Sequence, residues 1–96
     1  MLLKGKTAVV TGCNRGIGKK ILEIFSENGA TVFACVRNID EEFKLFLDKI
    51  SKKFSNEVIP IKLDLSDENQ IKEAANNILF SGDQVDILIN NAGIIN

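Results

Sequence analysis

The sequence predicts an α/β domain in which helices cover both faces of a parallel sheet. Short apolar runs alternate with amphipathic stretches along the 96 residues, in the order β-α-β-α-β-α-β. Right-handed crossovers between such units place each helix on a face of the sheet. A glycine-rich loop follows the first apolar run. Together these observations favour a doubly wound parallel sheet with the strand order 3-2-1-4.

The first half of the chain holds two expected strands and one expected helix. The β-branched run at 6–11 ends at Gly12 and has the pattern of a strand buried on both faces. A helix over 16–28 is expected from its apolar face, and Gly29 supplies a C-terminal stop. Residues 31–36 form the second expected strand. The apolar face of the helix consists of Ile17, Ile21, Ile24 and Phe25.

The next helix and strand follow the same scheme. Asn38 is the expected N-cap of the helix, because Glu41 lies three residues later and can reach back to it. The strand expected at 57–63 contains Pro60, which cannot donate a ladder hydrogen bond and therefore belongs at a sheet edge. The doubly wound order places the third strand at that edge. The apolar stripe of the helix contains Phe43, Phe46, Leu47, Ile50 and Phe54.

The last helix and strand complete the alternation. Ser66 is the expected N-cap of the third helix, and Gly82 ends it. Residues 85–90 form the fourth expected strand, which is apolar and lacks a partner on its far side within this sequence. The helix is expected to pack through Ile71, Ala74, Ala75, Ile78 and Leu79.

The composition excludes several classes of site. The chain contains no His, no Tyr and no Trp, so these 96 residues lack a catalytic His, a tyrosine phenol and a His-containing zinc site. Cys13 and Cys35 are expected to be reduced apolar fillers. A net charge of −1 argues against nucleic-acid binding, and no apolar run reaches membrane-span length. We expect a cytoplasmic protein with no nucleic-acid or membrane partner.

The glycine-rich loop has the features of a phosphate-binding turn. Gly12 permits a sharp exit from the strand, Gly16 lets the backbone approach a phosphate, and Gly18 allows close helix packing. The free amides of a helix N-terminus then face the phosphate. The spacing G-x-x-x-G-x-G differs from the G-x-G-x-x-G fingerprint. The alternative is a glycine-rich turn that binds no ligand.

The two arginines of the chain occupy informative places. Arg37 follows the second strand, where an acid would accept from a ribose 2′-hydroxyl and a base would pair with a 2′-phosphate. Arg15 would project from the glycine loop toward the same space, and guanidinium groups bind phosphate in a forked geometry. The alternative is two solvated surface charges. A methyltransferase-type domain would require an acid in place of Arg37.

Three ordered motifs carry a family resemblance. Thr11 to Gly18 as TGxxxGIG, Asp64 in LDLSD, and the NNAG run at 90–93 resemble the N-terminal part of the short-chain dehydrogenase/reductase family. The resemblance runs from about Gly5 to Asn96. It implies an incomplete Rossmann fold of four strands and three helices, and NADP(H) as cofactor. The cofactor-binding residues that it implies are Gly12, Asn14, Arg15, Gly16, Ile17, Gly18, Arg37, Asp64, Leu65, Asn91, Ala92 and Gly93.

The resemblance also implies a role for each motif. The glycine loop holds the pyrophosphate, while Arg15 and Arg37 favour NADP over NAD. Asp64 and Leu65 meet the adenine, and residues 91–93 lie along the nicotinamide-side ribose. Asn90 and Asp86 mainly stabilise the sheet. Taken alone, Asp64 could be a helix-entry acid and the run at 90–93 an ordinary turn.

The family's chemistry depends on residues that these 96 positions lack. A Ser and a Tyr-x-x-x-Lys pair follow the NNAG motif in the family, and this sequence contains no Tyr. We therefore expect residues 1–96 to be the NADP-binding half of a truncated reductase, inactive alone, whose full-length form is a homodimer or homotetramer. The opening and the VDILINNAGI segment are most similar to 3-oxoacyl-[acyl-carrier-protein] reductases of fatty acid biosynthesis. Alternatives are a reductase acting on a sugar or other small carbonyl, and a self-standing, non-catalytic NADP(H)-binding module.

Overall fold

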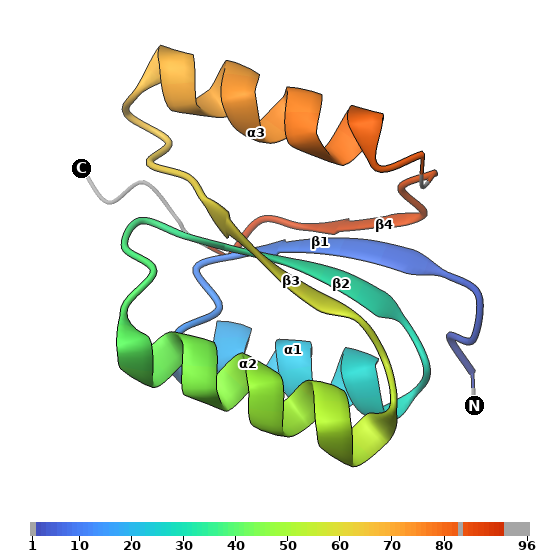
Figure 1. The fold of residues 1–96 in the computed structure, drawn as a ribbon. Coiled ribbons are helices and arrows are strands. Elements are labelled where there is room, and N and C mark those ends of the chain that lie inside the picture. Colours follow the sequence, from blue (N-terminus) through green and yellow to red (C-terminus); the bar gives the residue numbers. More distant parts are fainter. Residues whose placement is uncertain (1, 83, 92–96) are drawn as a thin grey trace.

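A four-stranded parallel sheet forms the centre of the molecule, in the order β3-β2-β1-β4 (Figure 1). The computed structural model describes residues 2–82 and 84–91. The observed order confirms the doubly wound arrangement expected from the sequence. The elements are β1 (Thr7–Thr11), α1 (Gly16–Glu27), β2 (Thr31–Val36), α2 (Glu41–Phe54), β3 (Val58–Lys62), α3 (Glu68–Phe80) and β4 (Ile87–Ile89).

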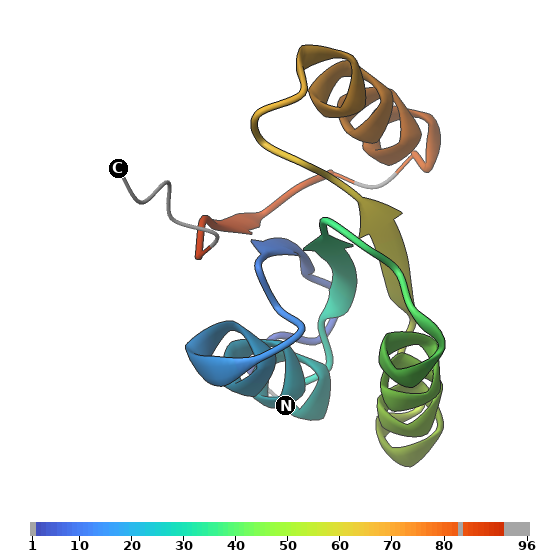
Figure 2. The same cartoon turned by 90° about the vertical axis from the view of Figure 1, so that its left-hand side faces the viewer.

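The helices divide between the two faces of the sheet. Figure 2 shows α1 and α2 on one face and α3 on the other. Leu22 of α1 and Leu47 of α2 pack with Val10 and Val32 in one apolar cluster. Ala74 of α3 belongs to a second cluster, which contains Val9, Phe33, Cys35 and Ile61. The sheet therefore separates two cores, as both-face coverage requires.

The central strands are more deeply buried than the outer ones. Every residue of β1 is buried, whereas Pro60 in β3 is exposed and pairs in register with Ala34 of β2. The edge position of Pro60 agrees with its missing N–H donor.

Two helix starts differ from the expected ones. Asp40, not Asn38, is the N-cap of α2, and its carboxylate accepts from the N–H of Phe43 at 2.8 Å. Asp67, not Ser66, is the N-cap of α3. In both helices the N-cap is a carboxylate and not the neutral side chain that was expected. Its negative charge is favourable at the positive end of the helix dipole.

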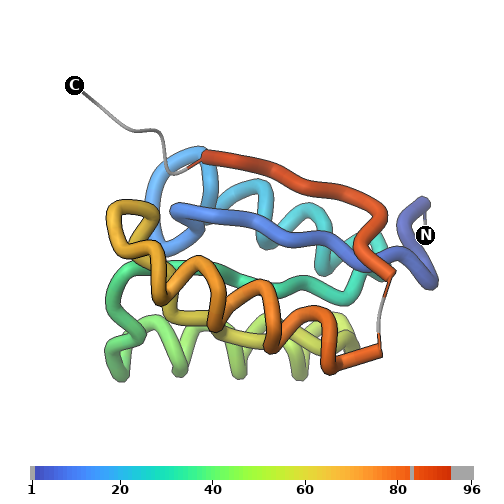
Figure 3. Tube along the Cα trace, turned by 90° about the horizontal axis from the view of Figure 1, so that it is seen from above, coloured from blue at the N-terminus to red at the C-terminus, as the bar shows by residue number. Residues whose placement is uncertain are grey.

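The third helix covers less of the sheet than expected. Ala74 is buried and Ile78 packs against the second cluster, but Ile71 and Leu79 are exposed. Seen from above in Figure 3, α3 lies over the β3 side of the sheet, and β4 runs along the opposite edge. Leu88 of β4 is accordingly 67% exposed. Within the described residues, no helix is long and apolar enough to cross a membrane.

Candidate functional site

The carboxyl ends of all four strands meet at one end of the sheet. The glycine loop follows β1, Arg37 follows β2, Asp64 lies just beyond β3, and Asn91 follows β4. The strand order reverses between β1 and β4, since β2 and β3 lie on the other side of β1. Ligands of doubly wound sheets bind outside the carboxyl ends of the strands at such a reversal.

The glycine loop owes its shape to three glycines. Gly12 and Gly16 both have a φ of 60°, in the left-handed region that favours glycine. Gly18 is buried, and a Cβ there would collide with the Gly12 carbonyl oxygen and with Asn91 Nδ2. A Cβ on Gly16 would meet no atom within 4 Å. Close packing therefore requires Gly18, whereas backbone conformation alone requires Gly16, whose outer side is open.

The N-terminus of α1 differs from those of the other two helices. Its N-cap residue is Arg15, whose side chain makes no capping hydrogen bond, and its first turn contains no acid. The carboxylates of Asp40 and Asp67 cap α2 and α3. The first amides of α1 thus have no side-chain acceptor from the cap position, and the positive end of the helix dipole is not offset by a carboxylate. This combination suits an anionic ligand.

Hydrogen bonds join the end of β4 to the glycine loop. The backbone N–H of Asn91 donates to Thr11 Oγ1 at 3.0 Å, and its side-chain Nδ2 donates to the Gly12 carbonyl oxygen at 3.1 Å. Thr11 Oγ1 donates to Asn90 Oδ1 at 3.1 Å. Asn91 therefore holds the loop in place, a role that the sequence motif did not indicate.

Asp86 joins β1 and β4 at the opposite end of these two strands. Its Oδ2 accepts from the Thr7 N–H at 2.9 Å, and its own N–H donates to the Thr7 carbonyl oxygen at 2.9 Å. The hydrogen bonds of Asp86 and Asn90 agree with the sheet-stabilising roles expected of them. The two other expected binding residues of this motif, Ala92 and Gly93, lie outside the described residues.

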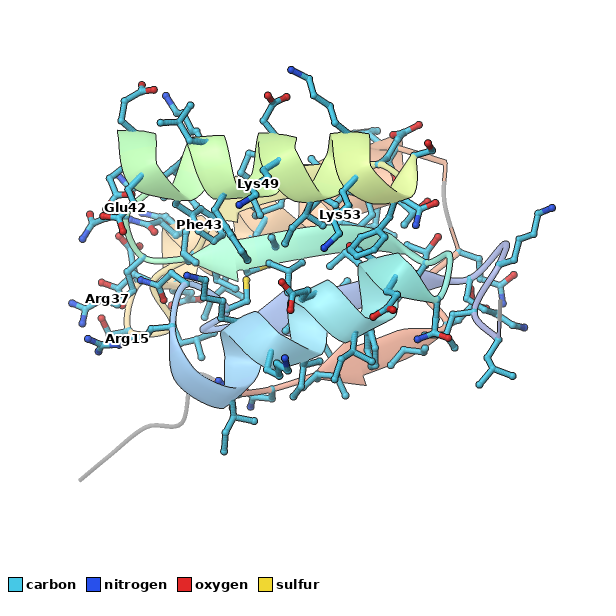
Figure 4. The ribbon with its side chains drawn as sticks, turned by 90° about the horizontal axis from the view of Figure 1, so that it is seen from below. Arg15, Arg37, Glu42, Phe43, Lys49 and Lys53 are labelled. Carbon is cyan, nitrogen blue, oxygen red and sulfur yellow. The ribbon has the colours of Figure 1, made fainter. Side chains whose placement is uncertain are left out.

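Two exposed guanidinium groups extend from this end of the molecule. In Figure 4, Arg15 and Arg37 point outward on the same side, Arg15 from the start of α1 and Arg37 from the end of β2. Arg37 Nη2 lies 3.7 Å from Asp64 Oδ2, which links the ends of β2 and β3. The structure thus brings the two arginines to one side of the molecule, as the sequence predicted, and places Asp64 beside Arg37.

Asp64 is held in place by its own loop. Its Oδ1 accepts from Ser66 Oγ at 2.7 Å and from the Ser66 N–H at 3.0 Å. Its backbone N–H donates to Gln70 Oε1 at 2.9 Å. The Ser66 hydroxyl, followed by the Ser66 amide and the Arg37 charge, lowers the pKa of the Asp64 carboxyl. Asp64 is therefore ionised at neutral pH. Leu65, beside it, is half-buried.

A small hollow lies between the glycine loop and the start of α2. Asn14 is at its loop side, and its volume is about 150 Å³. Lys19 Nζ lies 4.4 Å from the centroid of the Phe46 ring, which also lines the hollow. Lys19 was not expected at the site because the glycine spacing gives no signal for it. The remaining lining residues are Asp40, Glu42 and Phe43, and Figure 4 labels the last two.

The groups at this end of the sheet suit a ligand that carries several negative charges. Backbone amides of α1 and two guanidinium groups converge on one end of the sheet. Over residues 2–82 and 84–91, no three His, Cys, Asp or Glu side chains are grouped to hold a metal ion. The residues present therefore fit a ligand with more than one phosphate group.

Comparison with known sequences gives one family. Residues 6–96 match the family model described as short chain dehydrogenase. A 3-oxoacyl-[acyl-carrier-protein] reductase FabG from Thermotoga maritima is 37% identical over 94 residues, which are 98% of this chain and 37% of the relative. The chain spans about a third of the length of the curated relatives that it matches.

Solved structures share the fold. A metagenomic short-chain oxidoreductase in complex with NADP has a TM-score of 0.87 and 33% identity, over 98% of this chain and 42% of that one. L-sorbose reductase from Gluconobacter frateurii, complexed with NADPH and L-sorbose, has a TM-score of 0.86 and 29% identity, over 96% of this chain and 35% of that one.

Proposed function

Because this chain belongs to the short-chain dehydrogenase family, we propose that it is the NADP(H)-binding part of an oxidoreductase. The reaction is hydride transfer from NADPH to a carbonyl carbon, or in reverse from a secondary alcohol to NADP+. The observation that carries the proposal is the meeting of an uncapped α1 N-terminus with Arg15 and Arg37 at one end of the sheet. A dinucleotide with a third phosphate needs more positive charge than NAD does.

Each part of the site has a binding task in this proposal. The loop from Gly12 to Gly18, with Asn14 and Ile17, holds the pyrophosphate at the α1 amides. Arg15 and Arg37 pair with the 2′-phosphate through their forked donors. Asp64 and Leu65 contact the adenine, and residues 91–93 contact the nicotinamide-side ribose. When bound, the dinucleotide supplies or accepts the hydride, and the chain's own residues bind and orient it.

The substrate that we propose is a 3-oxoacyl group on an acyl carrier protein, which places the protein in fatty acid biosynthesis in the cytoplasm. The FabG relative supports this choice. The L-sorbose reductase neighbour supports a sugar carbonyl as the second candidate.

These 96 residues hold no tyrosine, so we propose that they are inactive by themselves and that the catalytic groups lie outside residues 1–96. The full-length protein is proposed to form a homodimer or homotetramer.

The cofactor proposal is tested by titrating the full-length protein with NADPH and NADH. We expect NADPH to bind more tightly, and Arg37→Ala to weaken NADPH much more than NADH. Asp48→Asn, a substitution on the outer side of α2, is the control and should change neither. If Arg37→Ala weakens the binding of NADPH and of NADH equally, Arg37 does not bind the 2′-phosphate.

The substrate proposal is tested separately, by turnover. We expect the full-length protein to oxidise NADPH in the presence of a 3-oxoacyl thioester and not with L-sorbose. Turnover with the sugar alone would favour the second candidate. NADPH binding with no turnover on any carbonyl would instead favour a non-catalytic binding module.

A further inference from the structure

A carboxylate lies beside the arginine that would read the 2′-phosphate. Arg37 Nη2 and Asp64 Oδ2 are 3.7 Å apart, across the ends of β2 and β3. A charge-assisted hydrogen bond between such groups has a length of about 2.7–2.9 Å. The pair is therefore an electrostatic contact and not a hydrogen bond.

This geometry decides what Asp64 does to Arg37. Without a hydrogen bond, the carboxylate does little to fix the direction of the guanidinium, and the Arg37 side chain is 77% exposed. The carboxylate does oppose the positive charge of Arg37, since opposite charges at this distance attract. A second anion at Arg37 would meet a guanidinium whose charge is already partly offset.

Asp64 cannot easily move aside for that second anion. The Ser66 hydroxyl and amide both donate to Asp64 Oδ1, at 2.7 Å and 3.0 Å. Gln70 of α3 accepts from the Asp64 backbone N–H. Three hydrogen bonds therefore hold the residue in the loop and leave Oδ2 facing Arg37.

We infer that Asp64 limits the preference for NADP(H) over NAD(H), because its carboxylate competes with the 2′-phosphate for the positive charge of Arg37. The inference rests on the proposed function. It concerns only the 2′-phosphate, which NAD lacks. Any contact of Asp64 with the adenine is common to both dinucleotides and cancels when their affinities are divided. The ratio of the two dissociation constants therefore isolates the competition.

The test compares NADPH and NADH binding to the full-length protein and to its Asp64→Asn variant, by fluorescence titration at low ionic strength. Asparagine keeps the shape and an oxygen acceptor for Ser66 and removes the charge. Since exposed ion pairs change equilibria by up to about fivefold, we expect the preference for NADPH to increase about two- to fivefold. The increase should shrink at high salt, where exposed charges are screened.

Two controls locate the effect. Asp48→Asn removes the same unit charge from α2, where Asp48 Oδ2 pairs with Lys52 Nζ at 2.9 Å, and should leave the ratio unchanged. In an Arg37→Ala background, Asp64→Asn should also leave it unchanged. If Asp64→Asn does not fold, Ser66→Ala replaces it. This variant removes the hydroxyl that holds the Asp64 carboxylate, which can then move away from Arg37, so the NADPH preference should increase by a smaller factor.

A failure of the competition and a failure of the proposed cofactor would give different results. An unchanged or smaller NADPH preference in Asp64→Asn would overturn the competition, and so would an equal increase in the Arg37→Ala background. If the unaltered protein binds NADPH no more tightly than NADH, the proposed cofactor fails instead, before the question of competition arises.

Discussion

The side-chain amide of Asn91 donates to the carbonyl oxygen of Gly12 at 3.1 Å and thereby joins the end of β4 to the loop after β1. The two residues are 79 positions apart in the chain. Gly18 lies against both groups, since a Cβ on it would collide with each of them. The loop, the first helix and the last described strand thus form one unit, whose integrity sets the shape of the candidate site.

Replacement of Gly18 by alanine should be costly. The added methyl collides with backbone at Gly12, which cannot move as a flexible side chain can. We expect Gly18→Ala to lower the free energy of unfolding by about 1–3 kcal/mol, measured by chemical denaturation. Gly18 lies in α1 and has no positive φ, so crowding by the added methyl group is the cause of the expected loss. An unchanged free energy of unfolding in Gly18→Ala would show that this crowding is unimportant.

The buried hydroxyl of Ser26 should be dispensable. Ser26 is fully buried in α1, and its Oγ has no hydrogen-bond partner among residues 2–82 and 84–91. Because an unsatisfied buried polar group costs about 1–3 kcal/mol, Ser26→Ala should raise the free energy of unfolding, by about 1 kcal/mol. Asn56→Ala is the contrasting variant, since Asn56 Nδ2 donates to the Ser26 carbonyl oxygen and its removal should destabilise. Destabilisation by Ser26→Ala would contradict this account.

Cys13 and Cys35 should react slowly with alkylating agents in the folded protein. Both are buried free thiols, as the sequence predicted. Burial raises the pKa of Cys13 to about 12 and that of Cys35 to about 11, from an ordinary 9.0. Neither thiol ionises at pH 8, and reaction requires the thiolate. Iodoacetamide labelling followed by mass spectrometry should therefore be slow in buffer and fast in denaturant.

The same thiols give a pH dependence of stability. Because their folded-state pKa values are raised, the folded form keeps its protons longer than the unfolded form does. Their contribution is complete below about pH 9 and is lost as the pH rises toward 11 and 12. Cys13→Ala with Cys35→Ala should flatten the alkaline limb of the stability curve. If the decrease of stability at high pH is the same in this variant, groups other than the two thiols cause it.

Asp64 should titrate below the ordinary carboxyl value of 3.8. The Ser66 hydroxyl is the largest cause, so Ser66→Ala should raise the pKa of Asp64 more than Arg37→Ala does. Because the folded-state pKa is lowered, the contribution of Asp64 to stability is present above about pH 3.8 and is lost as the pH falls further. Carboxyl carbon shifts in an NMR titration would measure this pKa, and an unchanged value in Ser66→Ala would contradict the assignment.

Local patterns accounted for the order of elements but not for all their ends. Asn38 and Ser66 fit a capping pattern, yet Asp40 and Asp67 cap the helices. Ser66 instead donates to Asp64, which lies two residues earlier. Both candidates in each loop are good caps, and the path of the connection between strand and helix decides between them.

The alternation of apolar runs and the glycine loop determined the fold class, the strand order and the edge position of Pro60, because periodicity and a missing donor act locally. The positions of Arg15 and Arg37 indicated the site for the same reason, because parallel strands end at one edge, and the family resemblance added Asp64. Only the tertiary structure decided that Asn91 holds Gly12, that Asp64 opposes Arg37 and that α3 leaves Leu88 exposed. Those facts depend on distances between segments remote in sequence, which no local pattern encodes.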